Sequence, residues 1–229
     1  MSTFLIGDTH FCHANIIRYC NRPFKTVQEM NQAIVDNWND IVKPNDQVFV
    51  LGDFCLGNKK AIIDMGQMLN GHKNLILGNH DNGSMNAYRE AGFELISKYP
   101  ILLHNYFLLS HAPLHTTPDG LYANIFAHVH DDPKYLTVSQ RSYCVSAERI
   151  DYTPVDFDYV CYAMENAEKS NNFDHFDVTY NIDKSNQACS SYALAPNGAP
   201  ICMSTKELDC CECGGNKDKC DFYTWAVTD

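Results

Sequence analysis

Five short apolar runs in the first 130 residues each end in side chains that can bind metal, and this feature limits the folds open to the chain. The runs are Phe4–Ile6, Val48–Leu51, Leu75–Leu77, Phe107–Leu109 and Ile125–Phe126. Carboxylate, amide or imidazole groups follow them: Asp8 and His10, Asp53, Asn79 with His80 and Asp81, His111, and His128 with His130. Because ligand groups collect at the carboxyl ends of strands in open α/β folds, the pattern predicts one polar site at the edge of a buried sheet.

The remaining periodicity predicts helices between the early strands and few helices between the later ones. Thr26 and Glu29 fit a capping box before a helix whose apolar residues recur at helical spacing up to Ile41. In the second half short strands follow one another, and His104 with Asn105 predicts a hairpin turn. This order indicates an α/β fold with a mixed sheet, or with two packed sheets, flanked by helices.

Composition and charge narrow the possible partners. The chain is 45% hydrophobic and 20% charged, which is typical of a globular protein. Its formal net charge of −11 disfavours long nucleic acids, because an acidic surface opposes broad contact with phosphate backbones. Bound divalent ions would reverse the charge locally, so a small phosphorylated substrate fits. We find no signal peptide and no apolar stretch near the ~20 residues that span a bilayer, and therefore expect a cytoplasmic protein without a membrane partner.

The cysteines divide the chain into two parts. Five of the eleven are scattered through the body, and the other six crowd toward the end, at Cys189, Cys202, Cys210, Cys211, Cys213 and Cys220. We therefore predict a main domain over residues 1–168 and a small Cys-rich extension over 169–229. A structural Zn²⁺ site, disulfides, or neither are the three alternatives for the extension, since it contains no CxxC pair and nothing marks the chain as secreted.

Seven of the strand-end side chains make a set of oxygen and nitrogen donors without thiolate: Asp8, His10, Asp53, Asn79, His111, His128 and His130. Such a set suits hard or borderline divalent metals. One aspartate can share its two oxygens between two cations, and metals about 3.5–4 Å apart clamp the attacking and leaving oxygens of a displacement. His80 diverges from its neighbour Asn79, which favours a role as general acid or as a donor to a phosphoryl group. The pattern predicts a dinuclear site.

The order of these motifs resembles the calcineurin-like metallophosphoesterase superfamily over roughly residues 1–168. The matching blocks are Asp8-x-His10, Gly52-Asp53, Gly78-Asn79-His80-Asp81, His111 and His128-x-His130. The opening, in which His13 follows His10 by three residues, is most similar to small bacterial or phage-type members. Ala127 departs from the family, which has glycine before the His-x-His pair, and we expect the ligands to tolerate the added methyl group.

The resemblance implies a four-layer α/β/β/α sandwich of two packed mixed sheets flanked by helices, and it assigns roles. Asp8, His10 and His130 would hold one metal, Asn79, His111 and His128 the second, and Asp53 would bridge them. His80 would lie beside the scissile phosphate, with Asp81 as its orienting partner. Mn²⁺ is the expected activating ion, with Fe, Zn or Ni as alternatives.

Four side chains are candidates for substrate binding. Asn79 is expected to serve both metal and substrate, His13 and Arg18 reach from the first loop, and His115 follows His111 by four residues. Arg149 is expected to pair with Glu148 or Asp151 instead of binding substrate.

We therefore expect a metallophosphoesterase that hydrolyses a P–O bond of a small nucleotide-like phosphodiester or phosphomonoester through a metal-bridging hydroxide. Two alternatives stay open. A nuclease of the same superfamily, acting on DNA or RNA ends, needs Lys and Arg clustered around the cleft, and the chain has 17 such residues against 28 acidic ones. A non-enzymatic metal-binding scaffold would be favoured if the purified protein held no metal.

Overall fold

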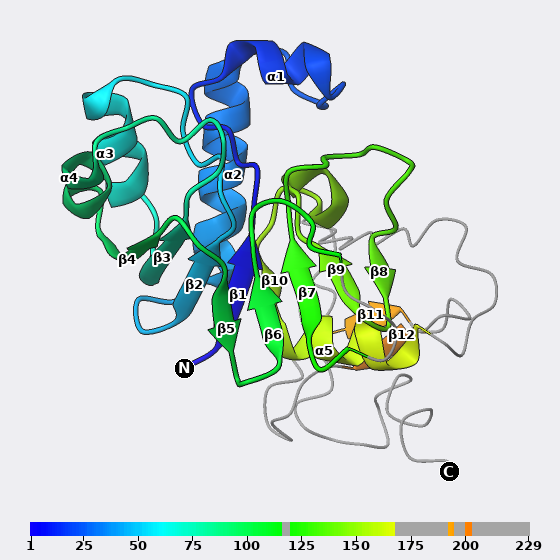
Figure 1. The fold of residues 1–229 in the computed structure, drawn as a ribbon. Coiled ribbons are helices and arrows are strands. Elements are labelled where there is room, and N and C mark those ends of the chain that lie inside the picture. Colours follow the sequence, from blue (N-terminus) through cyan, green and yellow to red (C-terminus); the bar gives the residue numbers. More distant parts are fainter. Residues whose placement is uncertain (116–119, 168–191, 195–199, 203–229) are drawn as a thin grey trace, which may run out of the picture. The chain divides into compact units, whose positions relative to one another are not determined.

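The computed structural model describes residues 1–115, 120–167, 192–194 and 200–202 (Figure 1). The chain divides into two compact units, Met1–Phe173 and Asp174–Asp229. The predicted boundary between residues 168 and 169 falls outside the described residues and stays a prediction.

The first sheet has the strand order β10-β1-β2-β3-β4. Four of its strands are parallel: β1 (Thr3–Ile6), β2 (Gln47–Val50), β3 (His72–Ile76) and β4 (Phe93–Ser97). The edge strand β10 (Val155–Asp156) runs antiparallel to β1. Phe49, Leu5 and Leu75 are buried, as expected for strands that are covered on both faces. Because the four main strands are parallel, their carboxyl ends meet at one edge of the sheet.

Four helices belong to this half: α1 (Ala14–Tyr19), α2 (Val27–Ile41), α3 (Lys59–Gln67) and α4 (Met85–Glu90). Figure 1 shows α2, α3 and α4 beside the first sheet. The hydroxyl of Thr26 accepts a hydrogen bond from the Glu29 amide at 3.1 Å, so α2 begins where its capping residue predicts. The Glu29 carboxylate accepts from the amide of Lys25, one residue earlier than a capping box requires.

The second sheet has the order β5-β6-β7-β9-β8. Its strands are β5 (Ile101–Leu103), β6 (Phe107–Leu109), β7 (Ala123–Phe126), β8 (Val138–Ser139) and β9 (Ser142–Cys144). The strands β6, β7 and β9 are parallel, while β5 and β8 are antiparallel edge strands. His104 and Asn105 have φ angles of 50° and 58° between β5 and β6, so the predicted hairpin turn is confirmed with left-handed backbone at both central residues.

The final helix of this unit, α5 (Phe157–Asn166), contacts β8 and β9 of the second sheet and β1 and β10 of the first. The two mixed sheets with their helices form the predicted α/β/β/α sandwich. Gly7 joins the sheets, because its amide donates to Val145 at 2.8 Å and its carbonyl accepts from Ala147 at 3.0 Å. Ala147 opens a short 3-10 helix, η1 (Ala147–Ile150). The strands β4, β8 and β10 were not anticipated from the sequence.

The second unit contributes one described hairpin, formed by antiparallel β11 (Tyr192–Leu194) and β12 (Pro200–Cys202). The predicted zinc or disulfide chemistry of the C-terminal cysteines lies outside the residues whose side chains are described. Among the described residues, no helix has the length and hydropathy needed to cross a membrane.

Trp38 anchors α2 in the core, and its replacement tests the packing of the first layer. The side chain is fully buried, and its indole N–H donates to the carbonyl of Asn70 at 3.0 Å. Trp38→Ala should lower the free energy of unfolding by about 3–5 kcal/mol, because it leaves a cavity and an unpaired carbonyl. Urea denaturation of the metal-free protein measures this loss. Gln32→Ala on the exposed face of α2 is the control and should change stability by less than about 0.5 kcal/mol.

Candidate metal centre

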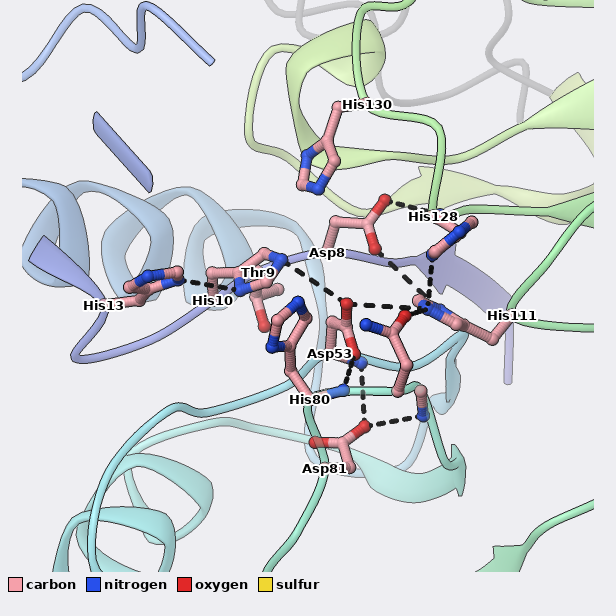
Figure 2. A network of polar contacts seen from close by, with 12 residues as sticks. Asp8, Thr9, His10, His13, Asp53, His80, Asp81, His111, His128 and His130 are labelled. Atoms are coloured by element: carbon pink, nitrogen blue, oxygen red, sulfur yellow. Dashed lines mark hydrogen bonds and ion pairs between the residues drawn. The ribbon is translucent and has the colours of Figure 1, made fainter. Parts of the chain in front are cut away.

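Loops at the strand ends bring the seven predicted ligands to one place, and all of them except Asn79 are labelled in Figure 2. Asp8, His10 and His130 form one group whose potential ligand atoms lie within 4.8 Å of one another. Asp53, His111 and His128 form a second group by the same measure. In the second group the amide oxygen of Asn79 lies 3.0 Å from Nε2 of His111, and Nδ1 of His128 lies 3.1 Å from the same atom.

Asp53 lies between the two groups. Its Oδ2 is 3.5 Å from Nε2 of His10 and also 3.5 Å from Nε2 of His111. One carboxylate oxygen therefore faces an imidazole nitrogen of each group, which is the position that a bridging ligand requires. The other oxygen, Oδ1, accepts a hydrogen bond from the backbone amide of His80 at 2.8 Å.

The hydrogen bonds of two imidazoles fit a metal at each group. Nδ1 of His111 lies 2.8 Å from the carbonyl oxygen of Leu51, which can only accept, so Nδ1 donates to it. Nε2 of His111 is then the ring nitrogen available to a metal, and it faces the oxygens of Asn79 and Asp53. Nδ1 of His130 is held in the same way by Glu148 Oε1 at 2.9 Å. Such outer partners orient the second ring nitrogen toward the centre and are typical of metal-binding histidines.

Two buried atoms give a second indication of the same fit. Oδ1 of Asp8 and Nε2 of His10 are buried and make no hydrogen bond within the described part of the chain. Buried polar atoms are nearly always satisfied, because an unpaired one costs about 1–3 kcal/mol. Both atoms belong to the first ligand group, where coordination would satisfy them.

The ligand loops use strained backbone. Five of the seven ligands have φ between 48° and 72°, in the left-handed region that side chains other than glycine rarely adopt: Asp8, His10, Asp53, His128 and His130. Each such residue costs on the order of 1–3 kcal/mol and persists only where its surroundings determine it. One support is the amide of His128, which donates to Asp8 Oδ2 at 2.7 Å.

Glycines in the motifs leave room for the ligands. A Cβ atom on Gly78 would lie 2.2 Å from Oδ1 of Asp53, and one on Gly52 would lie 2.4 Å from Nδ1 of His111. Gly7 has no side chain where the methyl group of Ala127 packs, since a Cβ there would approach that methyl group to 2.3 Å. Ala127 is buried and is not among the residues with positive φ, so the departure from the usual glycine leaves the backbone unstrained.

The carboxylate of Asp81 is held by backbone amides. Its Oδ2 accepts from the amides of Asp53 and Gly78, at 2.7 and 2.8 Å, and its Oδ1 accepts from the amide of Phe54 at 3.0 Å. Among the described hydrogen bonds, none joins the Asp81 carboxylate to the His80 imidazole. The buried carboxylate therefore fixes the loop that carries Asp53, and the role of Asp81 as the orienting partner of His80 stays a prediction.

The structure places the candidate substrate-binding residues in different surroundings. Nδ1 of His13 lies 3.2 Å from Nδ1 of His10, so His13 contacts one of the predicted ligands. Its ring also lies 6.3 Å from the ring of His80, at the open side of the centre. Arg18 is exposed on α1 and its guanidinium lies 5.6 Å from the ring centroid of Tyr19. His115 is exposed next to residues 116–119, which are not described.

Two buried charges beside the centre were missed by sequence reasoning. Arg22 and Glu148 form an ion pair at 2.7 Å, with side chains 0% and 5% exposed. No motif marks them, and 126 positions separate them in the chain, so no local signal reveals the pairing. Arg149 differs from its prediction: it donates to the carbonyls of His130, Asp132 and Tyr135, and so holds the loop after β7 instead of pairing with a carboxylate.

An α/β/β/α sandwich with two groups of oxygen and nitrogen ligands around a shared carboxylate defines the class of dinuclear metallohydrolases. The sequence model of the calcineurin-like phosphoesterase family matches residues 1–184. The chain belongs to this family, and the predicted family membership is confirmed.

The chain is also similar to individual proteins in sequence and in structure. An uncharacterized protein of Methanocaldococcus jannaschii is 36% identical over 176 residues, which cover 71% of this chain and 90% of that protein. A protein of unknown function from Aquifex aeolicus has a crystal structure that superposes with a TM-score of 0.53 at 25% identity, over 69% of this chain and 97% of that chain. Nuclease MPE of Pseudomonas putida superposes with a TM-score of 0.40 at 22% identity, over 56% and 61% of the two chains.

Metal binding to the first group should release protons. Burial raises the pKa of Asp8 from 3.8 to about 6. Burial by itself would lower the pKa of His130, but hydrogen bonds with Cys20 and Glu148 and the charge of Asp8 raise it to about 11. Both pKa values are raised, so the protonated forms persist to higher pH and compete with the metal.

The affinity should therefore rise about tenfold for each pH unit between pH 6.5 and 9, through His130, and fall more steeply below about pH 6, through Asp8. Calorimetric titration with Mn²⁺ in buffers of different ionisation enthalpy measures both the affinity and the protons released. An affinity that does not change between pH 5 and 8 would contradict the assignment.

Proposed function

We propose that the protein is a dinuclear metallophosphoesterase that hydrolyses a P–O bond of a small nucleotide-like phosphodiester or phosphomonoester. The observation that carries the proposal is the position of Asp53, whose Oδ2 lies 3.5 Å from an imidazole nitrogen of each ligand group. A carboxylate shared in this way suits two cations about 3.5–4 Å apart, the spacing of two-metal hydrolases.

The donor set indicates which ions fit. Carboxylate, amide and imidazole ligands suit Mn²⁺, with Fe, Zn or Ni as alternatives. When bound, two such ions would neutralise phosphoryl oxygens and lower the pKa of water, which is the chemistry that hydrolysis of a phosphoester needs. The protein holds the ligand loops rigid, and this preorganisation avoids a cost of rearrangement during the reaction.

His80 is the candidate proton donor. Its ring centroid lies 5.4 Å from that of His10, and its side chain is exposed at the open side of the centre. The backbone amide of His80 donates to Oδ1 of Asp53, so the main chain at His80 is held beside that carboxylate. An imidazole in this place can donate a proton to the leaving oxygen or a hydrogen bond to the phosphoryl group.

A cavity of about 330 Å³ beside His80 supports a small substrate. Its wall combines the apolar side chains of Leu56 and Ile62 with polar groups of Lys59, Asn82 and Ser84. Small-molecule sites have volumes of about 300–1,000 Å³ and combine apolar walls with a few polar groups. A group of nucleoside size, with an apolar face and a polar edge, fits this description. The net charge of −11 gives no support to a long nucleic acid as partner.

Substitution of the central residues tests the proposal. Asp53→Asn should reduce both metal content and hydrolysis, while His80→Ala should keep the metal and lower kcat about 10²–10⁴-fold, because only a proton donor is lost. The assay uses Mn²⁺ with a bis-aryl phosphate, an aryl phosphate, 2′,3′- and 3′,5′-cyclic nucleotides, dinucleotides and single-stranded DNA. His72→Ala, at an exposed imidazole paired with Glu94, is the control and should have no effect.

The outcomes separate the alternatives. Wild-type rates in both Asp53→Asn and His80→Ala would overturn the proposal. Preferential cleavage of single-stranded DNA would favour the nuclease, and purified protein without metal or hydrolysis would favour the binding scaffold.

Replacement of Lys59 tests whether the cavity binds substrate. Its ammonium lies 2.7 Å from Oε1 of Glu90 at the surface, and the lysine also lines the cavity. Lys59→Ala should raise KM about threefold for substrates with an anionic leaving group and leave kcat little changed, since exposed charges interact weakly. Glu90→Ala removes the same ion pair but no cavity wall, so its KM should not rise. Equal KM values for wild type and Lys59→Ala would exclude the cavity from substrate binding.

A further inference from the structure

The guanidinium of Arg22 contacts two separate segments of the chain. Its Nη2 and Nε lie 2.7 and 2.9 Å from Oε1 of Glu148. Its Nη2 also donates to the carbonyl of Asp8 at 2.7 Å, and its Nη1 donates to the carbonyl of Thr9 at 3.0 Å. The side chain therefore links the first ligand loop, between β1 and α1, to the short helix η1 at the opposite end of the domain sequence.

Glu148 continues the link to a third ligand. The Oε1 atom that binds Arg22 also accepts from Nδ1 of His130 at 2.9 Å. This contact fixes the imidazole ring of His130 and leaves Nε2 as the ring nitrogen available to a metal. Arg22 and Glu148 thus contact the backbone at Asp8 and the side chain of His130, and the left-handed loop that they hold also carries His10.

Stability of the fold gives a poor explanation for this pair. Burying two charges costs several kcal/mol, and apolar replacements of buried ion pairs are often neutral or stabilising. Oε2 of Glu148 is in addition buried without a hydrogen bond in the described part of the chain. A pair that is expensive to bury is better explained by the two ligand positions that it contacts, Asp8 and His130, whose φ angles are 54° and 49°.

We propose that Arg22 and Glu148 are positioning residues that set the metal affinity of one half of the centre, formed by Asp8, His10 and His130. The proposal rests on the dinuclear centre proposed above. Among the described hydrogen bonds and ion pairs, neither residue contacts a side chain of the other group. That group is held by the Leu51 carbonyl and by the Asp81 carboxylate. Loss of the pair should therefore weaken one metal and spare the other.

Cys20 offers a competing explanation. Its sulfur, with ligand atoms of His130 and Glu148, forms a group within 4.8 Å that could itself hold an ion. The guanidinium of Arg22 lies against the same carboxylate and opposes a cation there. Cys20→Ser therefore should leave the number of bound metals unchanged.

The test is a titration of the metal-free full chain with Mn²⁺, followed by calorimetry, metal analysis and kinetics. Wild type should bind two ions. Glu148→Gln keeps the shape of the side chain and removes its charge, and it should weaken one site about 10- to 100-fold while the second keeps its affinity. Excess Mn²⁺ should then restore kcat, a rescue that a damaged fold would not show. Arg22→Lys, which keeps the charge but loses the fork of donors, should weaken the same site.

Several outcomes would overturn the proposal. These are unchanged affinity of both sites in Glu148→Gln and Arg22→Lys, equal weakening of both sites, and loss of a metal in Cys20→Ser. Glu90→Gln, at an exposed ion pair, is the matched control and should bind metal as wild type does. Fewer than two ions in wild type would contradict the dinuclear centre itself, so the two failures are distinguishable.

Discussion

The position of the Asp53 carboxylate is the constraint on which the rest of the centre depends. Its main chain lies in the left-handed region, its amide is held by Asp81, and one of its oxygens is held by the His80 amide. Gly78 must lack a side chain because Asp53 occupies that space. With one oxygen committed to the backbone, the other is free to face both groups of ligands. The strand-end loops therefore assemble around one side chain.

The two halves of the centre are supported by different kinds of contact. The half with His111 is held mainly by backbone groups, such as the Leu51 carbonyl and the amides that bind Asp81. The half with Asp8 and His130 is held by the buried charges of Arg22 and Glu148. The Leu51 carbonyl does not titrate, whereas the Arg22–Glu148 ion pair depends on charge. This difference is the basis of the proposal that the pair acts on one metal site and spares the other.

The anionic substrate proposed for this protein has to be reconciled with its acidic composition. The buried Asp8 and Asp53 place negative charge at the centre, and burial raises the pKa of Asp8 because no opposite charge fully compensates it. Bound divalent ions would supply that compensation and would leave positive charge to attract a phosphate. The cavity beside His80, with Lys59 on its wall, is the place proposed for the remainder of a small substrate. Attraction is thus local, while the surface as a whole repels polyanions.

The sequence by itself determined the helices and most of the strands, because apolar periodicity, capping residues and hairpin turns act over a few positions. It also indicated the ligands from Asp8 to His130, since each follows a short apolar run and strand ends converge in α/β folds. The tertiary structure alone decided the partners. Asp81 accepts from the amide of Asp53, His13 contacts His10, and Arg22 meets Glu148 across 126 positions. Such contacts form between loops that are far apart in the sequence, so patterns over a few neighbouring residues cannot predict them.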